Sequence, residues 1–303
     1  MRWMPLAKKE FRGVVRYKAT WLLVPFLLLW GYQPNYLAYD VLGSDITLVY
    51  LQHMTGPILV LGTLLLSYQT VLKERSSGSL KFPLGLPLTR TDVLLGKIAG
   101  RTAGVGAVVL VADLLMAGIG LYQYGLFSPL GFVGMVVLSL VFVGVIVSIA
   151  TAISTVFDRT ITATAGTFLL YLPLFVLWDN FLVAEIRTRL LPVSNEQGGG
   201  TETQLSGNQE TMFYLIDRFE PMGNFQVVTN WILDAGNAST GAVSALASTN
   251  PEQAVFGGGD IVATAFDSVP FVLHEGFSVV WLVLWAVVPF AISWVTFTRG
   301  DVL

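Results

Sequence analysis

The stretch that decides the fold is Leu114–Phe157, LLMAGIGLYQYGLFSPLGFVGMVVLSLVFVGVIVSIATAISTVF, which contains no charged residue. A transmembrane helix needs about 20 apolar residues, so this run is too long for one crossing and long enough to serve two. A polar turn around Tyr122–Gly125 and Ser128–Pro129 divides it. We therefore predict one span over 98–122 and another over 130–157.

The rest of the chain has the same character. Of its 303 residues, 54% are apolar and 12% are charged, whereas a soluble domain carries about 25% charged residues. Further uncharged runs predict spans over 19–39, 47–72, 160–178 and 276–298. We expect an all-α integral membrane protein with six transmembrane helices. The chain has no cysteine, which excludes disulfides and thiol chemistry.

Basic residues indicate which connections lie on the cytoplasmic side of the membrane. Fourteen of the 17 lysines and arginines precede the first span, separate spans two and three, or follow spans four and six: Arg2, Lys8, Lys9, Arg12, Arg16, Lys18, Lys73, Arg75, Lys81, Arg90, Lys97, Arg101, Arg159 and Arg299. We therefore expect a multi-pass protein of the plasma membrane with both termini, including the tail 299–303, in the cytoplasm.

The long connection 179–275 between spans five and six then lies outside the cell. Acidic residues outnumber its arginines, and its centre is rich in Gly, Thr, Gln, Ser and Asn. Two amphipathic stretches, Met212–Phe219 and Phe225–Leu233, predict helices in this extracellular insert. The triplet Asn237-Ala-Ser239 matches a glycosylation acceptor, a pattern that is common by chance.

Residues 1–18 alternate basic with apolar side chains. On a helix, Lys8, Lys9, Arg12 and Arg16 share one flank and the apolar residues share the other. This pattern predicts a helix that lies in the cytoplasmic interface of the membrane. The alternative is a positive flank that only orients the first span.

The segment 73–97 is the most specific part of the sequence. It is a short cytoplasmic connection, yet it is rich in apolar residues between Leu80 and Leu88, which require a partner surface. Thr89 and Asp92 have the spacing of a capping box, which predicts that a helix begins near Arg90. Docking to a motor subunit would need such an apolar cytoplasmic element; a loop folded on its own helices is the alternative.

The order Glu-Arg-x-x-Gly-x-Leu, Pro-x-x-Arg and Gly-Lys within Glu74–Lys97 resembles the ABC-2 type permeases. Lys9-Glu10-Phe11 and the terminal Phe297–Asp301 resemble the two ends of that family, and the large insert most resembles its NosY-like branch. The resemblance covers the whole predicted topology. Pro83 and Gly85 depart from it, because such proteins usually continue a helix there.

The resemblance implies a permease that forms a homodimer or heterodimer and pairs with separate ABC ATPase subunits, which bind ATP and magnesium. It assigns coupling or ATPase docking to the loop after span two. The residues concerned are Glu74, Arg75, Gly78, Leu80, Leu84, Pro87, Arg90, Gly96 and Lys97. The chain itself is expected to hold no cofactor.

Asp113 is the one acid well inside a predicted span. Because a charge in hydrocarbon costs about 2.5–3.5 kcal/mol even on lenient scales, it is either a residue of a transport pathway or a neutral structural acid. The two histidines, His53 and His274, lie in separate segments and do not make up a metal-ligand set, so we expect no metal site.

The sequence contains no Gly-x4-Gly-Lys-Ser/Thr motif and no nucleophile–base pair at one membrane depth. We therefore expect no catalysis by this chain, and nothing in it indicates nucleic-acid binding. The leading interpretation is the permease of an ATP-driven exporter. The alternatives are an ATP-independent carrier or channel, and a membrane scaffold or assembly factor.

Overall fold

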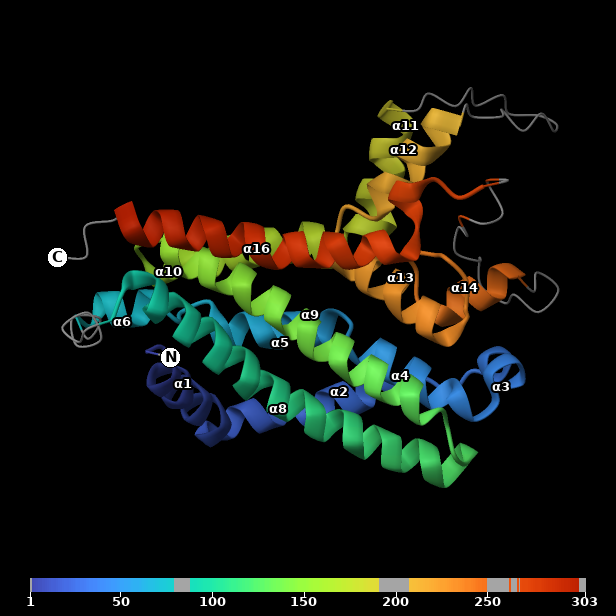
Figure 1. The fold of residues 1–303 in the computed structure, drawn as a ribbon, viewed down its shortest axis with the longest axis horizontal. Coiled ribbons are helices and arrows are strands. Elements are labelled where there is room, and N and C mark those ends of the chain that lie inside the picture. The colour runs from blue at the N-terminus through green and yellow to red at the C-terminus, as the bar shows by residue number, and fades with distance from the viewer. Residues whose placement is uncertain are drawn as a thin grey trace. The chain divides into compact units, whose positions relative to one another are not determined.

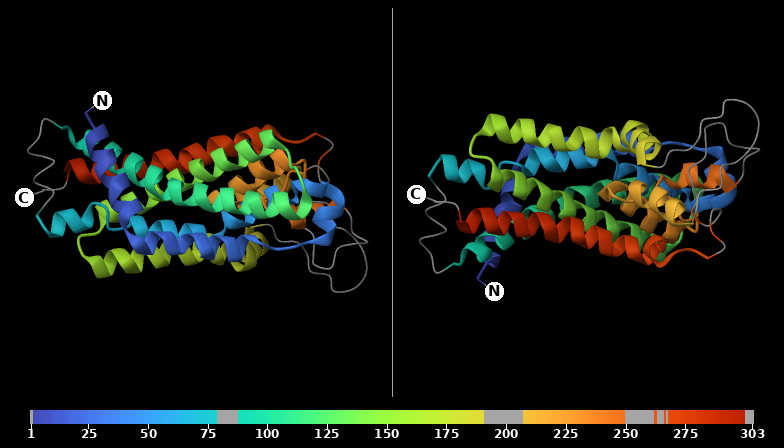
Figure 2. Two further views of the ribbon diagram at one scale, coloured as in Figure 1. Left: turned by 90° about the horizontal axis from the view of Figure 1, so that it is seen from below. Right: turned by 90° about the horizontal axis from the view of Figure 1, so that it is seen from above.

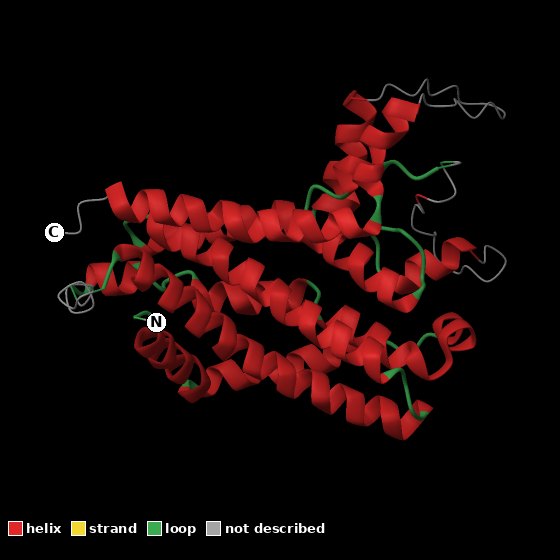
Figure 3. Ribbon diagram, in the orientation of Figure 1, coloured by secondary structure: helices red, strands yellow, loops and turns green. Residues whose placement is uncertain are grey.

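The computed structural model describes residues 2–78, 88–190, 207–249, 262, 266 and 268–299. Every regular element among these residues is helical (Figure 3), which confirms the predicted all-α class. The chain forms two compact units, Met1–Leu170 with Leu282–Leu303, and Tyr171–Trp281.

The first unit begins with α1 (Met4–Arg16), the turn η1 (Lys18–Leu22) and α2 (Leu23–Gly31). A bend of 63° separates α1 from the apolar helix that follows, and Figure 2 shows α1 lying obliquely to the longer helices of this unit. The helix α2 ends at Gly31, short of the predicted limit of 39. Tyr32 adopts an extended backbone there, and Pro34 has no N–H with which to continue a helix.

The second predicted span, 47–72, is broken. After α3 (Tyr36–Leu42) and η2 (Gly43–Asp45), α4 (Ile46–Met54) ends before Gly56, and α5 (Pro57–Ser67) starts afresh with Pro57 in its first turn. The bend at this break is 40°. Proline is tolerated in the first turn of a helix because its missing N–H would have no partner there.

Three long helices complete the first unit: α8 (Arg90–Tyr124), α9 (Pro129–Val156) and the main part of α16 (Glu275–Arg299). The predicted capping box is present, since Thr89 accepts from the Asp92 N–H and Asp92 accepts from the Thr89 N–H. The helices α8 and α9 pack side by side (Figure 1), and Gly125 with Ser128 forms the predicted turn between them.

Segment 73–97 is therefore not one continuous loop. Its first residues belong to α6 (Leu72–Ser76), and its last eight positions, 90–97, form the start of α8. The remaining boundary positions, 77–78 and 88–89, are also described, whereas 79–87 lies outside the described residues.

Among the described residues, α8, α9 and Glu275–Thr298 are long and apolar enough to cross a membrane. The number rises to five if each bent pair, Met4–Gly31 and Ala38–Ser76, counts as one span, and Thr160–Val176 is a shorter apolar helix. The fifth predicted span, 160–178, begins as α10 (Thr160–Tyr171).

The second unit starts with two π-helical turns, η3 (Leu172–Val176) and η4 (Trp178–Leu182), and continues with α11 (Val183–Leu190). Of the residues described, α12 (Gly207–Asp217), α13 (Pro221–Leu233) and α14 (Ala242–Thr249) follow, and then the turn η6 (Phe271–Leu273). Both amphipathic stretches predicted in the insert are thus largely helical, in α12 and α13.

A buried arginine in the second unit forms hydrogen bonds with two segments that are distant from it in the sequence. Arg218 is 1% exposed and donates to the Leu273 carbonyl at 2.6 Å and to the Asn237 Oδ1. Asn237 in turn donates to the same Leu273 carbonyl at 2.9 Å. Burial lowers the pKa of Arg218 to about 10, against the opposing influence of Glu275 and Asp217, so the guanidinium stays charged at neutral pH.

Asn237 is therefore not available as the glycosylation acceptor that its triplet resembles. Its side chain is held by Arg218 and Leu273, and the residue is 5% exposed. An oligosaccharide needs an exposed surface asparagine.

Candidate functional site

The site is built on a close approach between α1 and α8. Gly96, Gly100 and Gly104 recur every fourth residue on α8 and face α1. A Cβ on Gly100 would lie 2.4 Å from the Ala7 carbonyl oxygen, and one on Gly104 would lie 2.8 Å from the Val14 Cβ. Such small residues let two helix backbones approach in a membrane protein.

This contact buries one stripe of α1. Leu6, Glu10 and Val14, four residues apart, are its buried residues, whereas Phe11 remains 36% exposed. Leu6 and Val14 contact α8, so part of the apolar flank of this helix is covered by protein, and its position in the cytoplasmic interface stays a prediction. Glu10 lies between these two apolar residues and needs a buried partner.

Lys97 and Arg101 on α8 supply that partner. Lys97 Nζ lies 3.1 Å from Glu10 Oε1 and 2.7 Å from Glu74 Oε2, and Arg101 Nε lies 3.1 Å from Glu10 Oε2. We call these four residues, Glu10, Glu74, Lys97 and Arg101, the charge cluster. It joins α1, α6 and α8, which are far apart in the sequence.

Backbone carbonyls also accept hydrogen bonds from both cations of the charge cluster. Lys97 Nζ also donates to the Thr70 carbonyl at 3.0 Å, and Arg101 donates to the Leu66 carbonyl. Both carbonyls lie near the end of α5, where the helix has stopped and i→i+4 partners are missing. The cationic side chains of α8 therefore also hold the α5–α6 connection.

Glu74 occupies the edge of the cluster, where it meets solvent. Its other carboxylate oxygen lies 3.3 Å from Lys9 Nζ. Burial alone would raise the pKa of Glu74, but Lys97 and Lys9 outweigh it and hold the pKa below its ordinary value of 4.5. The carboxylate is thus ionised at neutral pH.

Two further contacts extend the site. Arg75 NH1 lies 2.8 Å from the exposed carboxylate of Asp158, in the turn between α9 and α10. Arg90 donates to the carbonyls of Phe297 and Thr298 at 2.6 and 2.9 Å, and its guanidinium lies 5.9 Å from the Phe297 ring centroid. The first turn of α8 is thereby tied to the last turns of α16.

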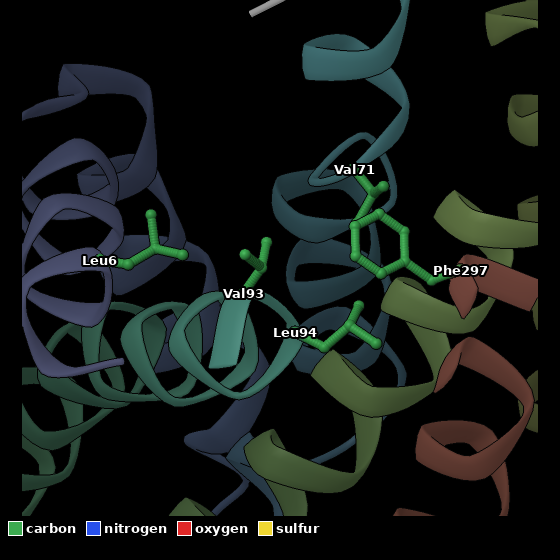
Figure 4. Packing of buried hydrophobic residues seen from close by; sticks show 5 residues of the cluster. All are labelled: Leu6, Val71, Val93, Leu94 and Phe297. Atoms are coloured by element: carbon green, nitrogen blue, oxygen red, sulfur yellow. The ribbon is translucent and has the colours of Figure 1, made fainter. Parts of the chain in front are cut away.

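An apolar cluster lies beside these contacts. Figure 4 shows its five buried members, which come from α1, the α5–α6 connection, α8 and α16: Leu6, Val71, Val93, Leu94 and Phe297. Leu88, just before α8, packs against them. At least this last apolar residue of the segment 80–88 is covered by its own chain.

The predicted site residues divide into three groups. Glu74, Arg75 and Arg90 make the contacts above, and Gly78 is exposed with φ +69°, a backbone conformation that favours glycine. Leu80, Leu84 and Pro87 lie outside the described residues.

Gly96 and Lys97 form the third group, because both are buried. Gly96 packs on Trp3 and Leu6, and Lys97 is 0% exposed. In this conformation they do not offer a surface to a partner, and their role in coupling stays a prediction.

Glu10 and Arg101 were missed as members of the site. Glu10 is the one acid in the basic segment 1–18, and its spacing with Leu6 and Val14 places it on the stripe that α8 covers. A single acid on an apolar stripe indicates a buried carboxylate that needs a cationic partner. Its partners on α8 could not be inferred from spacing.

Asp113 lies three turns beyond the charge cluster on α8, about 18 Å from Arg101 at 1.5 Å per residue. It is 0% exposed, and neither carboxylate oxygen has a hydrogen-bond partner within the described parts of the chain. The structure does not bring it together with the other predicted residues. Its assignment as a pathway or structural acid stays a prediction.

Comparison with known proteins gives the class of this fold and site. Residues 4–302 match the family described as ABC-2 family transporter protein. The chain therefore belongs to the ABC-2 transporter family, as the resemblance in Glu74–Lys97 predicted, and it is a membrane permease component of an ABC transporter. No curated protein matches it individually.

Proposed function

We propose that this chain is the transmembrane permease subunit of an ATP-driven exporter, and that a separate ATPase subunit engages it through residues 74–97. The observation that carries the proposal is the 2.7 Å ion pair between Glu74 and Lys97. Glu74 precedes residues 79–87 in the sequence and Lys97 follows them, and we call 79–87 the docking segment. Their ion pair therefore joins the helices on the two sides of the docking segment.

The ion pair gives the docking segment a mechanical connection to the spans. A force on 79–87 reaches α6 through Glu74 and the start of α8 through Lys97. Because Lys97 also pairs with Glu10, and Arg90 holds the end of α16, α1 and α16 would follow the same displacement. A packed cluster of this kind transmits movement as a unit rather than deforming gradually.

In this mechanism the predicted residues have different tasks. Leu80, Leu84 and Pro87 contact the ATPase, and Gly78 permits the turn that leads into them. Glu74, Lys97 and Gly96 position the segment on the helices behind it, while ATP and magnesium remain in the partner. The subunit acts as a homodimer or heterodimer of permeases.

The proposed topology has six crossings. Three long helices, two bent pairs and Thr160–Val176 make six if each is one span. With the basic residues on the cytoplasmic side, both termini lie in the cytoplasm of a plasma-membrane protein, and the insert 179–275 lies outside.

Sided cysteine labelling tests both the topology and the docking. Because the chain has no cysteine, Ser77→Cys and Tyr122→Cys each provide a single exposed thiol at the two ends of the spans; Tyr122 is 92% exposed. A membrane-impermeant maleimide should modify Ser77→Cys only in inside-out vesicles and Tyr122→Cys only in right-side-out vesicles.

The docking test uses the ATPase that co-purifies with the tagged chain. When this ATPase is bound, the rate at which Ser77→Cys is labelled should fall at least about tenfold. A tenfold change corresponds to about 1.4 kcal/mol. Tyr122→Cys is the matched control, whose rate should not change. Labelling of Ser77→Cys from outside would overturn the topology, and unchanged labelling with the ATPase bound would overturn docking at 74–97.

A further inference from the structure

A cavity of about 600 Å³ lies beside the charge cluster in the first unit. Its walls come from α1, η1, α5, α6 and α8, and they combine two kinds of side chain. Lys9, Lys73, Arg101 and Gln69 are the polar side chains that we call its polar part. Val14, Leu65 and Leu66 are the apolar side chains that we call its apolar part, so the cavity is amphipathic.

The charges around the polar part do not balance. Glu10 and Glu74 are the acids that line the cavity, and they face the basic residues Lys9, Lys73 and Arg101, with Lys97 directly behind them. Four positive charges against two negative ones leave a surplus of two. An anion is therefore the ligand that this part of the cavity would favour.

Lys73 is the cation free to bind such an anion. Lys9 and Arg101 are engaged with Glu74 and Glu10. Lys73 is exposed and forms no ion pair with any residue that the structure describes. Its ammonium group offers three donors on a flexible stem, which suits a phosphate oxygen.

Exposed apolar side chains lie in the cavity lining and just after it along the chain. Leu65 is 45% exposed, and Leu22 and Phe26, which follow the cavity-lining Thr20 along the chain, are 59% and 57% exposed. Trp21, between Thr20 and Leu22 in the sequence, donates to the Val15 carbonyl at 2.8 Å. Tryptophan at a span end marks the membrane–water interface.

We propose that this cavity binds one anionic phospholipid, with its phosphate near Lys73 and Arg101 and an acyl chain along Leu65. A free phosphate would use only the polar part and would leave the apolar walls uncovered. Basic pockets between transmembrane helices are suited to anionic headgroups. The site goes beyond the transport function and does not depend on an ATPase, because every residue in it belongs to this chain.

Native mass spectrometry of the full chain in detergent tests the proposal. The protein is mixed with equal amounts of dioleoyl phosphatidylglycerol and dioleoyl phosphatidylcholine, which share their acyl chains and differ in headgroup charge. One phosphatidylglycerol should be retained per chain in preference to phosphatidylcholine. Lys73→Gln should weaken retention about fivefold, since one lysine near an anionic lipid contributes on the order of a few-fold in affinity.

Lys8→Gln is the matched control, because Lys8 is an exposed lysine of α1 that does not line the cavity. It should retain phosphatidylglycerol as the unmodified chain does. Equal retention of the two lipids, or equal losses in the two variants, would overturn the proposal.

A soluble headgroup separates the lipid from a free phosphate. Glycerol 1-phosphate at about 10 mM should leave the bound phosphatidylglycerol in place, because it lacks the acyl chains that cover Leu65 and Leu66. Displacement at that concentration would assign the site to a soluble phosphate instead of a lipid. Thermal unfolding of Lys73→Gln in phosphatidylcholine alone checks that this exposed substitution leaves the fold intact.

Discussion

The charge cluster and the Arg218 network both bury cationic side chains, but they satisfy them differently. In the charge cluster, Lys97 and Arg101 face carboxylates from two other helices. Arg218 instead binds a carbonyl and an amide within its own unit. The first arrangement links α1, α6 and α8 through charge, whereas the second fastens one turn of the insert to α12.

This difference has a consequence for movement. Lys97 holds acceptors that come from α1, from α6 and from the connection before α6 at the same time, so a movement of one of these elements reaches the others. The Arg218 side chain instead donates to Leu273 and Asn237, which both belong to the second unit. We therefore expect the helices that the charge cluster joins to move together during transport, and the insert that the Arg218 network stabilises to remain rigid.

The largest effect is expected from Lys97→Met. It removes the cation that Glu74 and Glu10 share, while Lys9 stays beside Glu74 and Arg101 stays beside Glu10. Breaking a buried ion pair from one side costs about 3–5 kcal/mol. The thermal midpoint of the purified protein in detergent should fall accordingly.

A second substitution distinguishes lost charge from lost packing. In Lys97→Met with Glu74→Gln, the carboxylate that lost its closest cation is neutral, so part of the lost stability should return. If the double variant is as unstable as the sum of the two single variants, the residues do not act as a cluster.

A smaller and more local effect is expected from Arg218→Met. The Asn237 Oδ1 loses its donor, while the Leu273 carbonyl keeps Asn237 as a partner. One unsatisfied buried group costs about 1–3 kcal/mol. Limited proteolysis should cut within 207–249 faster, whereas cleavage within 90–156 should not change.

Arg189→Met is the control for that experiment. Arg189 pairs with Glu185 on the surface of α11, where its side chain is 77% exposed, and such pairs contribute little. Equal protease sensitivity of the Arg218 and Arg189 variants would contradict the structural role of Arg218.

The smallest effect is expected from Gly100→Ala, which tests the close approach beneath the charge cluster. The added Cβ meets the Ala7 backbone and the Glu10 side chain, and overpacking costs about 1–3 kcal/mol. Alanine favours the helix by up to about 1 kcal/mol over glycine. The net loss should be on the order of 1 kcal/mol, measured as a lower thermal midpoint.

Gly118→Ala is the matched control on the same helix. Nothing lies within 4 Å of its added Cβ, so only the helix preference remains and stability should be unchanged or slightly higher. A loss of stability in Gly118→Ala equal to that in Gly100→Ala would show that the contact with α1 is not the cause.

The sequence predicted the elements that local patterns encode. Long uncharged runs predicted α8, α9 and α16, and the Thr89–Asp92 spacing predicted the start of α8. The motif in Glu74–Lys97 predicted the family, which the match over residues 4–302 confirms. These features depend on residues close together in the chain, where hydrophobic length and capping act directly.

Only the tertiary structure decided which charges meet. Glu10, Glu74 and Lys97 come from three helices, and their pairing depends on the close approach of α1 to the glycine stripe of α8. The same packing turned Gly96 and Lys97 inward, and separate packing within the second unit buried Asn237 against Arg218 and Leu273. Sequence alone determined that the chain is a helical membrane protein, because burial in lipid requires long apolar helices. Which polar groups are buried together was decided by packing, because it joins residues that no local pattern relates.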